Sequence, residues 1–335
     1  MVCGADESFA MPLAVVLAST VANLDANRRI SVFVLDGGLT RASAERITSL
    51  GTPDRVSVHV LRPDLSVLEK LPISSHVNVC TYLRLLIPRV LPESLERAIY
   101  LDSDMVVLSD LGRLWDEPLD GRHCLAVQDL SAPVMDARHG LPAYRRCAPY
   151  LSTIRPIPNY KAFGFPPFKK YFNVGVMAID LAKWRQDDVT ARLLQCLNDN
   201  RRHLRWHDQY ALNVVLADGW RELDYRWNQT SHVYAFPSWE RSPLSAETFD
   251  LVRSDPFIVH FNTRRKPWHV GCQHPKRAAF FQYLAMTPWA GARATRRPWN
   301  LKRWCRERVE DTMVLGGRSY RWLTARAASA GTDVL

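Results

Sequence analysis

Two aspartates separated by one residue, Asp102 and Asp104, follow directly on the apolar run at residues 97–101. In an extended backbone, side chains two residues apart point to the same side, so both carboxylates can bind one ligand. Hard divalent cations such as Mg²⁺ and Mn²⁺ take oxygen ligands, and such a cation can neutralise a departing diphosphate. The alternative is a turn in which the two aspartates cap the following segment. The position after a strongly apolar strand strengthens the case for a metal site, and both interpretations stay open.

Short apolar runs alternate with helical patterns in the first part of the chain. Residues 30–35 are β-branched and aromatic, and they end in the turn signal Asp36-Gly37-Gly38. Thr40 is suited to cap a helix that begins after it. This order of elements favours a parallel sheet with helices on both faces. The expected strands are residues 1–5, 30–35 and 56–61, and the expected helices are about 10–23 and 40–50.

The same patterns continue along the chain and indicate an α/β fold. Ligands in open α/β sheets gather at the carboxyl ends of the strands. The polar residues that follow strands, such as Asp102 and Asp129, are therefore candidate site residues. Further strands are expected at residues 97–101, 106–108, 124–127, 171–179 and 257–260, and helices at 181–198 and 208–216.

Residues 131–170 contain seven prolines and show little periodicity. A long stretch of this kind inside a domain is usually functional or flexible. One interpretation is a lid or an acceptor-binding loop, and the other is a tolerated surface insertion. The sequence does not separate the two.

The composition is that of a globular protein. The chain has 335 residues, of which 47% are hydrophobic, enough for a sizeable core. Its seven cysteines are scattered and never spaced as CxxC, which argues against a disulfide framework and against a zinc-binding cluster. No apolar run reaches transmembrane length, and Asp6 and Glu7 precede the apolar residues 11–21, where a signal peptide carries positive charge. We therefore expect a cytoplasmic protein.

The net charge is +10, and much of the excess lies near the end of the chain. Residues 293–326 hold ten Arg or Lys against three acidic residues, together with Trp299 and Trp304. Three interpretations stay open: a solvated or packed tail, docking on an anionic membrane surface, and binding of single-stranded nucleic acid. Nucleic acid is the least favoured, because no recognition motif accompanies the basic residues. We expect a main domain over residues 1–285 and a basic helical extension over residues 286–335.

Six segments, in the same order along the chain, resemble the motif blocks of glycosyltransferase family 8, whose members are retaining enzymes that use sugar nucleotides. The chain resembles in particular the bacterial lipopolysaccharide galactosyl- and glucosyltransferases of this family. The resemblance implies a GT-A type fold, which is a Rossmann-like mixed sheet flanked by helices. The blocks are Ala5-Asp6, Thr81-Tyr82-Leu83-Arg84, Leu101-Asp102-Ser103-Asp104, Tyr171-Phe172-Asn173-Val174-Gly175-Val176, His207-Asp208-Gln209-Tyr210-Ala211-Leu212-Asn213, and His260-Phe261 with Lys266-Pro267-Trp268-His269.

The resemblance implies that His260 joins Asp102 and Asp104 as a third metal ligand. A neutral imidazole beside two carboxylates suits Mn²⁺ better than Mg²⁺. For a single histidine at a strand end, the alternative is a hydrogen-bonded residue of the core.

The resemblance also implies a binding site for the UDP-sugar donor. Ala5 and Asp6 would meet the uracil, with an aromatic face offered by Phe9 or a neighbour. A guanidinium suits phosphate oxygens, although a surface salt bridge is the alternative for the arginine of the second block. The lysine of the last block would contact the diphosphate, and Thr263 stands where the family usually has a glycine. The residues expected at the donor are Ala5, Asp6, Phe9, Arg84, Asp102, Ser103, Asn173, His260, Thr263 and Lys266.

The expected catalytic residues are Gln209, Asp208 and Asp129. By the resemblance, Gln209 faces the anomeric centre of the sugar opposite the leaving diphosphate. A glutamine is a poor nucleophile, so we expect front-face attack by the acceptor hydroxyl, with retention of configuration. The alternative role for Asp208 is that of a helix cap. His76, eight residues before Arg84, matches the spacing of an acceptor-contacting histidine in the family.

Together these features predict a metal-dependent transferase that moves a hexose from UDP-glucose or UDP-galactose to a hydroxyl acceptor. The acceptor would be a saccharide or a glycolipid in cell-surface polysaccharide synthesis. If the basic end binds anionic lipid, the enzyme would be peripheral at the inner face of the plasma membrane. The alternative is a catalytically silent protein that binds a sugar nucleotide or docks on a membrane, because a fold can outlive its activity.

Overall fold

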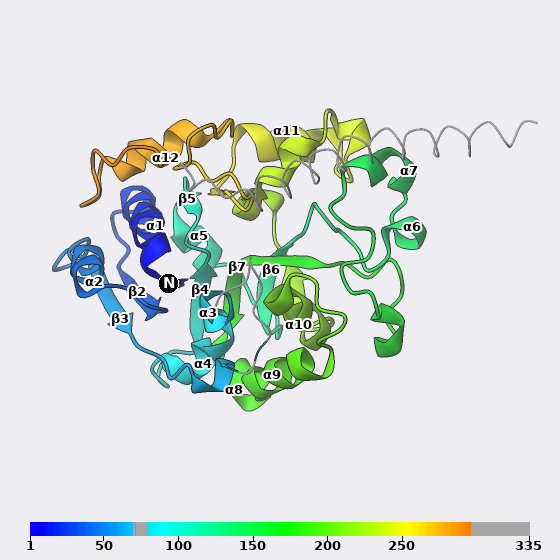
Figure 1. Ribbon diagram of the computed structural model, residues 1–335, viewed down its shortest axis with the longest axis horizontal. Helices are drawn as coiled ribbons and strands as arrows, with labels where there is room; N and C mark the ends of the chain where they lie inside the picture. Colours follow the sequence, from blue (N-terminus) through cyan, green and yellow to red (C-terminus); the bar gives the residue numbers. More distant parts are fainter. Residues whose placement is uncertain (70, 72–78, 296–335) are drawn as a thin grey trace, which may run out of the picture.

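A seven-stranded sheet forms the centre of the computed structural model, which describes residues 1–69, 71 and 79–295 (Figure 1). The strand order is β3-β2-β1-β4-β7-β6-β8. The strands are β1 (Val2–Ala5), β2 (Ile30–Asp36), β3 (Val56–Leu61), β4 (Arg97–Leu101), β6 (Cys124–Gln128), β7 (Phe172–Asp180) and β8 (Trp220–Glu222).

The sheet is mixed in direction. Strands β3, β2, β1 and β4 pair in parallel, as the sequence predicts, but β7 is antiparallel to both β4 and β6. The connection between β6 and β7 explains the reversal. The backbone N–H of Asp129 donates to the carbonyl of Tyr171 at 2.9 Å. Residues 131–170 therefore start at the end of β6 and return beside the same point to begin β7. The parallel order predicted for the first strands is confirmed, and so is the mixed sheet implied by the resemblance.

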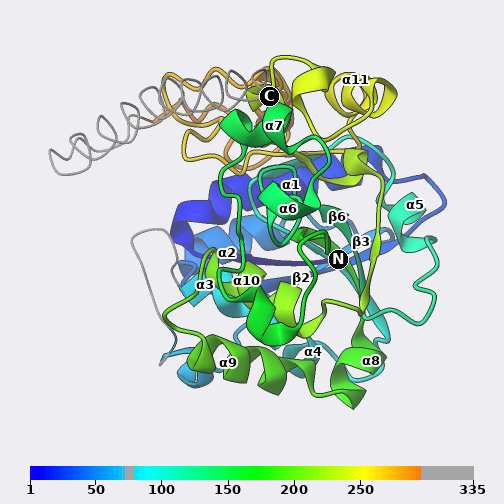
Figure 2. The same ribbon diagram turned by 90° about the vertical axis from the view of Figure 1, so that its right-hand side faces the viewer.

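Helices cover both faces of the sheet (Figures 1 and 2). Strand β4 contributes side chains to the core on both faces, because alternate residues of a strand point to opposite sides. Ala98 and Tyr100 belong to one buried cluster, and Ile99 and Leu101 belong to another. On one face lie α1 (Ala10–Asn23) and α12 (Arg277–Leu284), and on the other lie α4 (Ile87–Val90), α8 (Leu181–Gln186), α9 (Val189–Asp199) and α10 (His207–Val215).

The helix predicted at residues 181–198 is wrong as a single element. It is interrupted between α8 and α9, where Asp188 has a φ of 42°. The Asp188 side chain accepts from the backbone N–H of Ala191 and so caps α9. The predicted cap at Thr40 is confirmed, because its side chain accepts from Ser43 N at the start of α2 (Arg41–Thr48). Helix α11 (Ala246–Ser254) and α12 were not predicted.

A second sheet of three short strands joins distant parts of the chain. Its order is β5-β10-β9, and the strands are β5 (Met105–Val107), β9 (Gln229–Thr230) and β10 (Ile258–His260). Strand β10 pairs antiparallel with β5, so that His260 lies opposite Met105. The backbone N–H of Phe261 also donates to the carbonyl of Asp104 at 2.9 Å. This sheet brings His260 beside the two aspartates.

The proline-rich residues 131–170 pack against the rest of the molecule. They include the short helices α6 (Ala137–Gly140) and α7 (Tyr144–Cys147). Met135 and Ile157 are fully buried. Asp136 is also buried, and its Oδ2 accepts from Arg155 Nε at 2.8 Å. These contacts place the segment on the body of the protein and leave its role, lid or insertion, as a prediction.

Residues 287–295 lie on the body of the protein. Trp289 is half-buried with the Arg46 guanidinium over its ring, and Thr295 N donates to the carbonyl of Trp268 at 2.9 Å. Residues 296–335, which carry most of the basic end, lie outside the described residues. Among the residues that the structure describes, no helix combines the length and the hydropathy that crossing a membrane requires.

Candidate active site

Asp102 and Asp104 lie in the short link between β4 and β5 and project to one side of it. Asp102 N donates to the carbonyl of Gly175 at 2.9 Å, which extends the pairing of β4 with β7 by one residue. Ser103 points the other way, and its Oγ donates to the carbonyl of Gly4 at 2.7 Å. The alternation expected from the sequence is present, and it leaves the Ser103 hydroxyl bonded inside the sheet.

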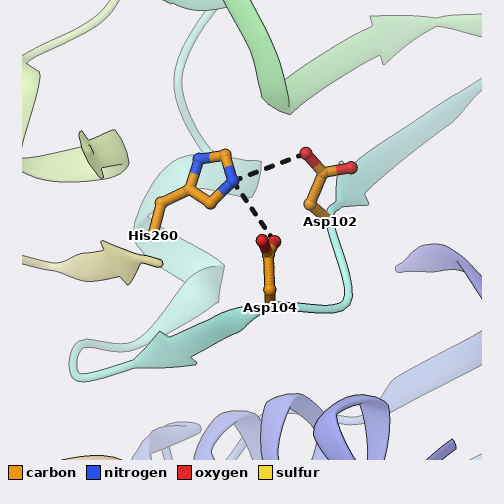
Figure 3. A group of neighbouring side chains, drawn as sticks. All are labelled: Asp102, Asp104 and His260. Atoms are coloured by element: carbon orange, nitrogen blue, oxygen red, sulfur yellow. Dashed lines mark ion pairs between the residues drawn. The ribbon is translucent and has the colours of Figure 1, made fainter. Parts of the chain in front are cut away.

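His260 faces both carboxylates from the end of β10 (Figure 3). Its Nε2 lies 3.2 Å from Asp104 Oδ1 and 3.6 Å from Asp102 Oδ2. One ligand atom from each of the three residues lies within 4.8 Å of the other two. We call these three residues the carboxylate–histidine cluster.

Each carboxylate of the cluster is held by its other oxygen. Asp102 Oδ1 accepts from Tyr100 Oη at 2.7 Å and from Arg84 Nη2 at 2.8 Å. Asp104 Oδ2 accepts from Lys266 Nζ at 2.5 Å. The two oxygens that face the histidine are therefore oriented by bonds made elsewhere on the same groups.

The pKa of the Asp104 carboxyl lies well below its usual range. Burial alone would raise this pKa, but Lys266 and His260 outweigh burial because both stabilise the charged form. Asp104 is accordingly an anion at neutral pH.

The cluster suits a divalent cation. Two carboxylate oxygens and one imidazole nitrogen make a mixed ligand set that first-row transition metals accept and that is softer than Mg²⁺ prefers. His260 is only 3% exposed, yet its Nε2 meets two carboxylate oxygens. This arrangement is stabilised either by a proton on Nε2 or by a cation among the three atoms.

Arg84 is a buried bridge, so the surface salt bridge considered from the sequence is wrong. In addition to its bond to Asp102, its Nε lies 3.0 Å from Asp208 Oδ2. Its Nη1 donates to the carbonyl of Val174 at 3.0 Å. Burial lowers the pKa of the guanidinium, but Asp102, Tyr100 and Asp208 outweigh burial and raise the pKa overall. Arg84 therefore connects the carboxylate–histidine cluster to α10.

Asp208 lies in the first turn of α10 but is not its cap. The N-cap position is held by Trp206, which makes no side-chain cap bond. Burial raises the pKa of Asp208 to about 6, against the opposing effect of Arg84. Trp206 and His207 have φ values of 50° and 35°, a left-handed conformation that costs non-glycine residues roughly 1–3 kcal/mol each. This strained turn directs the start of α10 inward.

A second group of buried polar side chains lies beside Arg84, and we call it the amide network. Gln209 Nε2 and Asn173 Nδ2 both donate to Asp129 Oδ2, each at 3.0 Å. Asp129 Oδ1 accepts from the backbone N–H of Ser131 at 2.7 Å and from its hydroxyl at 2.6 Å. The network consists of Asp129, Asn173, Gln209 and Asn228, all less than 10% exposed.

The residues expected around the uracil lie at the end of β1. The carbonyl of Ala5 accepts from Gly37 N at 2.9 Å. Asp6 Oδ1 accepts from Phe9 N at 3.2 Å and from Ser8 Oγ at 2.6 Å, which shapes a short 3-10 turn. Phe9 is half-buried and meets the Trp268 ring edge-on at 5.8 Å between centroids.

No described contact joins Thr263 to the carboxylate–histidine cluster or to the amide network. Thr263 is exposed, and its hydroxyl lies 3.4 Å from the carbonyl of Arg265. His76 lies outside the described residues.

Three residues at the site were missed in the sequence. Tyr100 precedes the aspartates and holds one of them through its hydroxyl. Asn228 lies 2.9 Å from His260 Nδ1, and no sequence pattern marks it. Gly175 has no room for a side chain, because a Cβ would lie 2.5 Å from His260 Cε1 and 2.9 Å from Asp102 Oδ2. A glycine inside an otherwise apolar strand is a sign of such close approach.

Comparison with known proteins agrees with the geometry. Residues 1–272 match the family described as Glycosyl transferase family 8. General stress protein A of Bacillus subtilis (strain 168) is 30% identical over 288 residues, which cover 85% of this chain and 92% of that protein. Lipopolysaccharide 1,2-glucosyltransferase of Escherichia coli (strain K12) is 23% identical, with 85% of this chain and 77% of that protein covered.

A crystal structure of the galactosyltransferase LgtC, in complex with donor and acceptor sugar analogues, has the same fold. Its TM-score is 0.69 at 22% identity, over 86% of this chain and 95% of that chain. The GT-A fold expected from the sequence is therefore confirmed. This chain is a glycosyltransferase and belongs to family 8.

Proposed function

We propose that this protein is a retaining, metal-dependent transferase that moves a hexose from a UDP-sugar to a hydroxyl acceptor. The observation that carries the proposal is the convergence of Asp102 Oδ2, Asp104 Oδ1 and His260 Nε2 within 4.8 Å of one another. A divalent cation bound there, Mn²⁺ in preference to Mg²⁺, would offset the negative charge of the departing UDP.

Lys266 supports the same task. Its ammonium lies at the edge of the carboxylate–histidine cluster, bonded to Asp104 and to the carbonyl of Phe261 at 2.7 Å. A positive charge at this place would attract the diphosphate and stabilise the charge that develops on it.

Gln209 and Asp208 would face the reacting carbon of the sugar. Among the described residues, the bond that Gln209 Oε1 accepts is a weak one from Val174 N, at 3.3 Å, and a carbonyl oxygen has two lone pairs. The second lone pair can ease positive charge at the anomeric carbon, as can the carboxylate of Asp208 once it is ionised. The acceptor hydroxyl attacks from the face that the UDP leaves. As the new C–O bond forms, the old one breaks, the leaving phosphate takes the hydroxyl proton, and the configuration is retained.

The names of the relatives support the proposed donor and acceptor. One relative is named a glucosyltransferase and a structural neighbour a galactosyltransferase, so UDP-glucose and UDP-galactose are both proposed. The relatives named for lipopolysaccharide support a saccharide or glycolipid acceptor. We also propose a cytoplasmic site of action, with membrane docking through residues 293–326, most of which lie outside the described residues.

The test is release of UDP from a panel of UDP-sugars, without acceptor and then with candidate glycolipids. We expect Mn²⁺ to support release best and a chelator to abolish it. Full activity in the presence of a chelator would contradict the proposed metal site. An NMR assignment of the product linkage checks retention, and an inverted linkage would contradict the proposed mechanism.

A further inference from the structure

Asn228 lies between the carboxylate–histidine cluster and the rest of the amide network. It is 2% exposed and precedes β9. Its Oδ1 lies 2.9 Å from His260 Nδ1, and its Nδ2 lies 2.9 Å from Asn173 Oδ1. Both ends of this one amide are therefore engaged by buried polar groups.

The orientation of Asn173 follows from its two other partners. Its Nδ2 faces the carboxylate of Asp129, which already receives bonds from Ser131 and Gln209 and acts as an acceptor. Its Oδ1 receives the backbone N–H of Gly175 at 3.0 Å, which can only donate. If the Asn173 amide were turned over, its oxygen would face the Asp129 carboxylate and its NH₂ group would face the N–H of Gly175, so neither contact could be a hydrogen bond.

The orientation of Asn173 in turn determines that of Asn228. Because Asn173 presents an oxygen, Asn228 must present its NH₂ group to it. The Asn228 oxygen is then left for His260, and a carbonyl oxygen accepts only. His260 Nδ1 must therefore carry a hydrogen. In a neutral imidazole the other nitrogen is then the acceptor, so the lone pair of Nε2 points at Asp102 and Asp104.

We infer that Asn228 is a positioning residue for the metal site: it holds His260 in the tautomer whose Nε2 can bind a cation. The inference rests on the proposed function, because it takes the carboxylate–histidine cluster to be a metal site. Outer partners of this kind fix the ring orientation and the tautomer of a metal-binding histidine. The same chain of amides ends on Asp129, which also holds Gln209. One buried framework thus orients a residue on the metal side and a residue on the sugar side.

The experiment measures Mn²⁺ binding to the full chain by the EPR signal of the free ion. We compare the wild type with Asn228→Leu, His260→Ala and the double variant. Losing such an outer partner typically weakens metal binding by about 10–100-fold, and we expect this for Asn228→Leu. In the His260→Ala background the same change should alter the Kd less than about twofold, because Asn228 acts through the histidine.

A matched control is Gln229→Met. Gln229 is the adjacent buried amide, but its Nε2 donates to the carbonyl of Val252 and to Tyr234 Oη, and no described hydrogen bond joins its side chain to His260. We expect the control to bind Mn²⁺ like the wild type. Asn228→Asp keeps an acceptor for His260 Nδ1 but loses the donor to Asn173 Oδ1, so it should bind Mn²⁺ more weakly than the wild type and more tightly than Asn228→Leu. Circular dichroism verifies folding, and Asn228→Ser replaces the leucine variant in the cycle if that variant does not fold.

The outcomes are distinct. A wild type that binds no Mn²⁺ would defeat the proposed metal site, and with it this inference. If the wild type binds and Asn228→Leu binds equally well, the metal site stands and the role of Asn228 is wrong. Equal weakening in both backgrounds, or an aspartate variant as weak as the leucine variant, would also overturn it.

Discussion

The carboxylate–histidine cluster and the amide network lie side by side, but they differ in how donors and acceptors are paired. In the cluster, two carboxylate oxygens and an imidazole nitrogen, all three capable of accepting, face one another. In the network, every amide hydrogen bond described above joins a donor to an acceptor. The cluster thus suits a positive ion, whereas the network is a set of amides paired around the Asp129 carboxylate, and we propose that it meets the hydroxyls of the sugar.

Arg84 stabilises the buried carboxylates on either side of it. It is the buried cation that touches Asp102 on one side and Asp208 on the other. Removing one partner of a buried charge leaves the other uncompensated. Arg84 therefore links the carboxylate–histidine cluster to Asp208, which precedes Gln209 of the amide network in α10.

A substitution at Asp104 tests the carboxylate–histidine cluster and has the largest expected effect. Asp104→Asn removes a charged ligand from the cluster, and we expect kcat/KM with Mn²⁺ to fall about 1000-fold, since metal stabilisation of a leaving group is worth several kcal/mol. UDP release measures the effect. Asp116→Asn, which alters an exposed carboxylate paired with Arg28, is the control and should retain activity. A loss of less than about tenfold in Asp104→Asn would count against the cluster as a metal site.

A substitution at Gln209 tests the other region. Gln209→Ala removes the carbonyl that we propose to lie near the reacting carbon, and we expect kcat/KM to fall about 100-fold, as for other preorganised polar groups. The bond from Asn173 to Asp129 remains, so the Kd for Mn²⁺ should change less than about twofold. Steady-state kinetics and Mn²⁺ titration measure the two effects. A parallel loss of metal binding would show that the two regions do not act separately.

Gly175 tests the packing between the two regions. In Gly175→Ala the added Cβ would press on the His260 ring, and overpacking of this kind typically costs about 1–3 kcal/mol of unfolding free energy. Urea denaturation measures the loss, and Mn²⁺ binding should weaken with it. Gly4→Ala is the milder comparison, because its nearest neighbour is the end of the Leu83 side chain at 3.1 Å. Equal stability of Gly175→Ala and the wild type would contradict this packing.

The smallest expected effect is the pH dependence of stability at Asp208. Because its pKa is raised to about 6, ionising Asp208 in the folded protein costs free energy. Stability present below pH 4 is lost as the pH rises through about 6. Asp208→Asn lacks this loss, so without metal its stability relative to the wild type should increase by about 1 kcal/mol from pH 5 to pH 8. Urea denaturation at both pH values checks this, and a pH-independent difference would contradict it.

Much of the site could be predicted because its signals are local. The aspartates follow an apolar strand at a spacing of two, and Ser103 turns inward between them as the period of a strand requires. The six blocks identified the family and the GT-A fold before the structure, and the comparisons confirm both. The helix cap at Thr40 was readable for the same reason.

Other features depend on contacts between distant segments. The break between α8 and α9 at Asp188 interrupts a pattern that reads as one helix, because the packing of two helices overrides local propensity. Strand β7 is antiparallel to its neighbours because residues 131–170 return the chain to the end of β6 at which they began. Asn228 has no local mark, since only the pairing of β9 with β10 brings it to His260.

The sequence by itself determined which side chains carry charge and how Asp102 and Asp104 are spaced, because neighbours along a strand alternate by covalent geometry alone. The tertiary structure decided which nitrogen of His260 meets them, since that depends on strand pairings and on a chain of buried amides from Asn228 to Asp129. Such contacts arise only when remote segments pack together, so no local pattern encodes them.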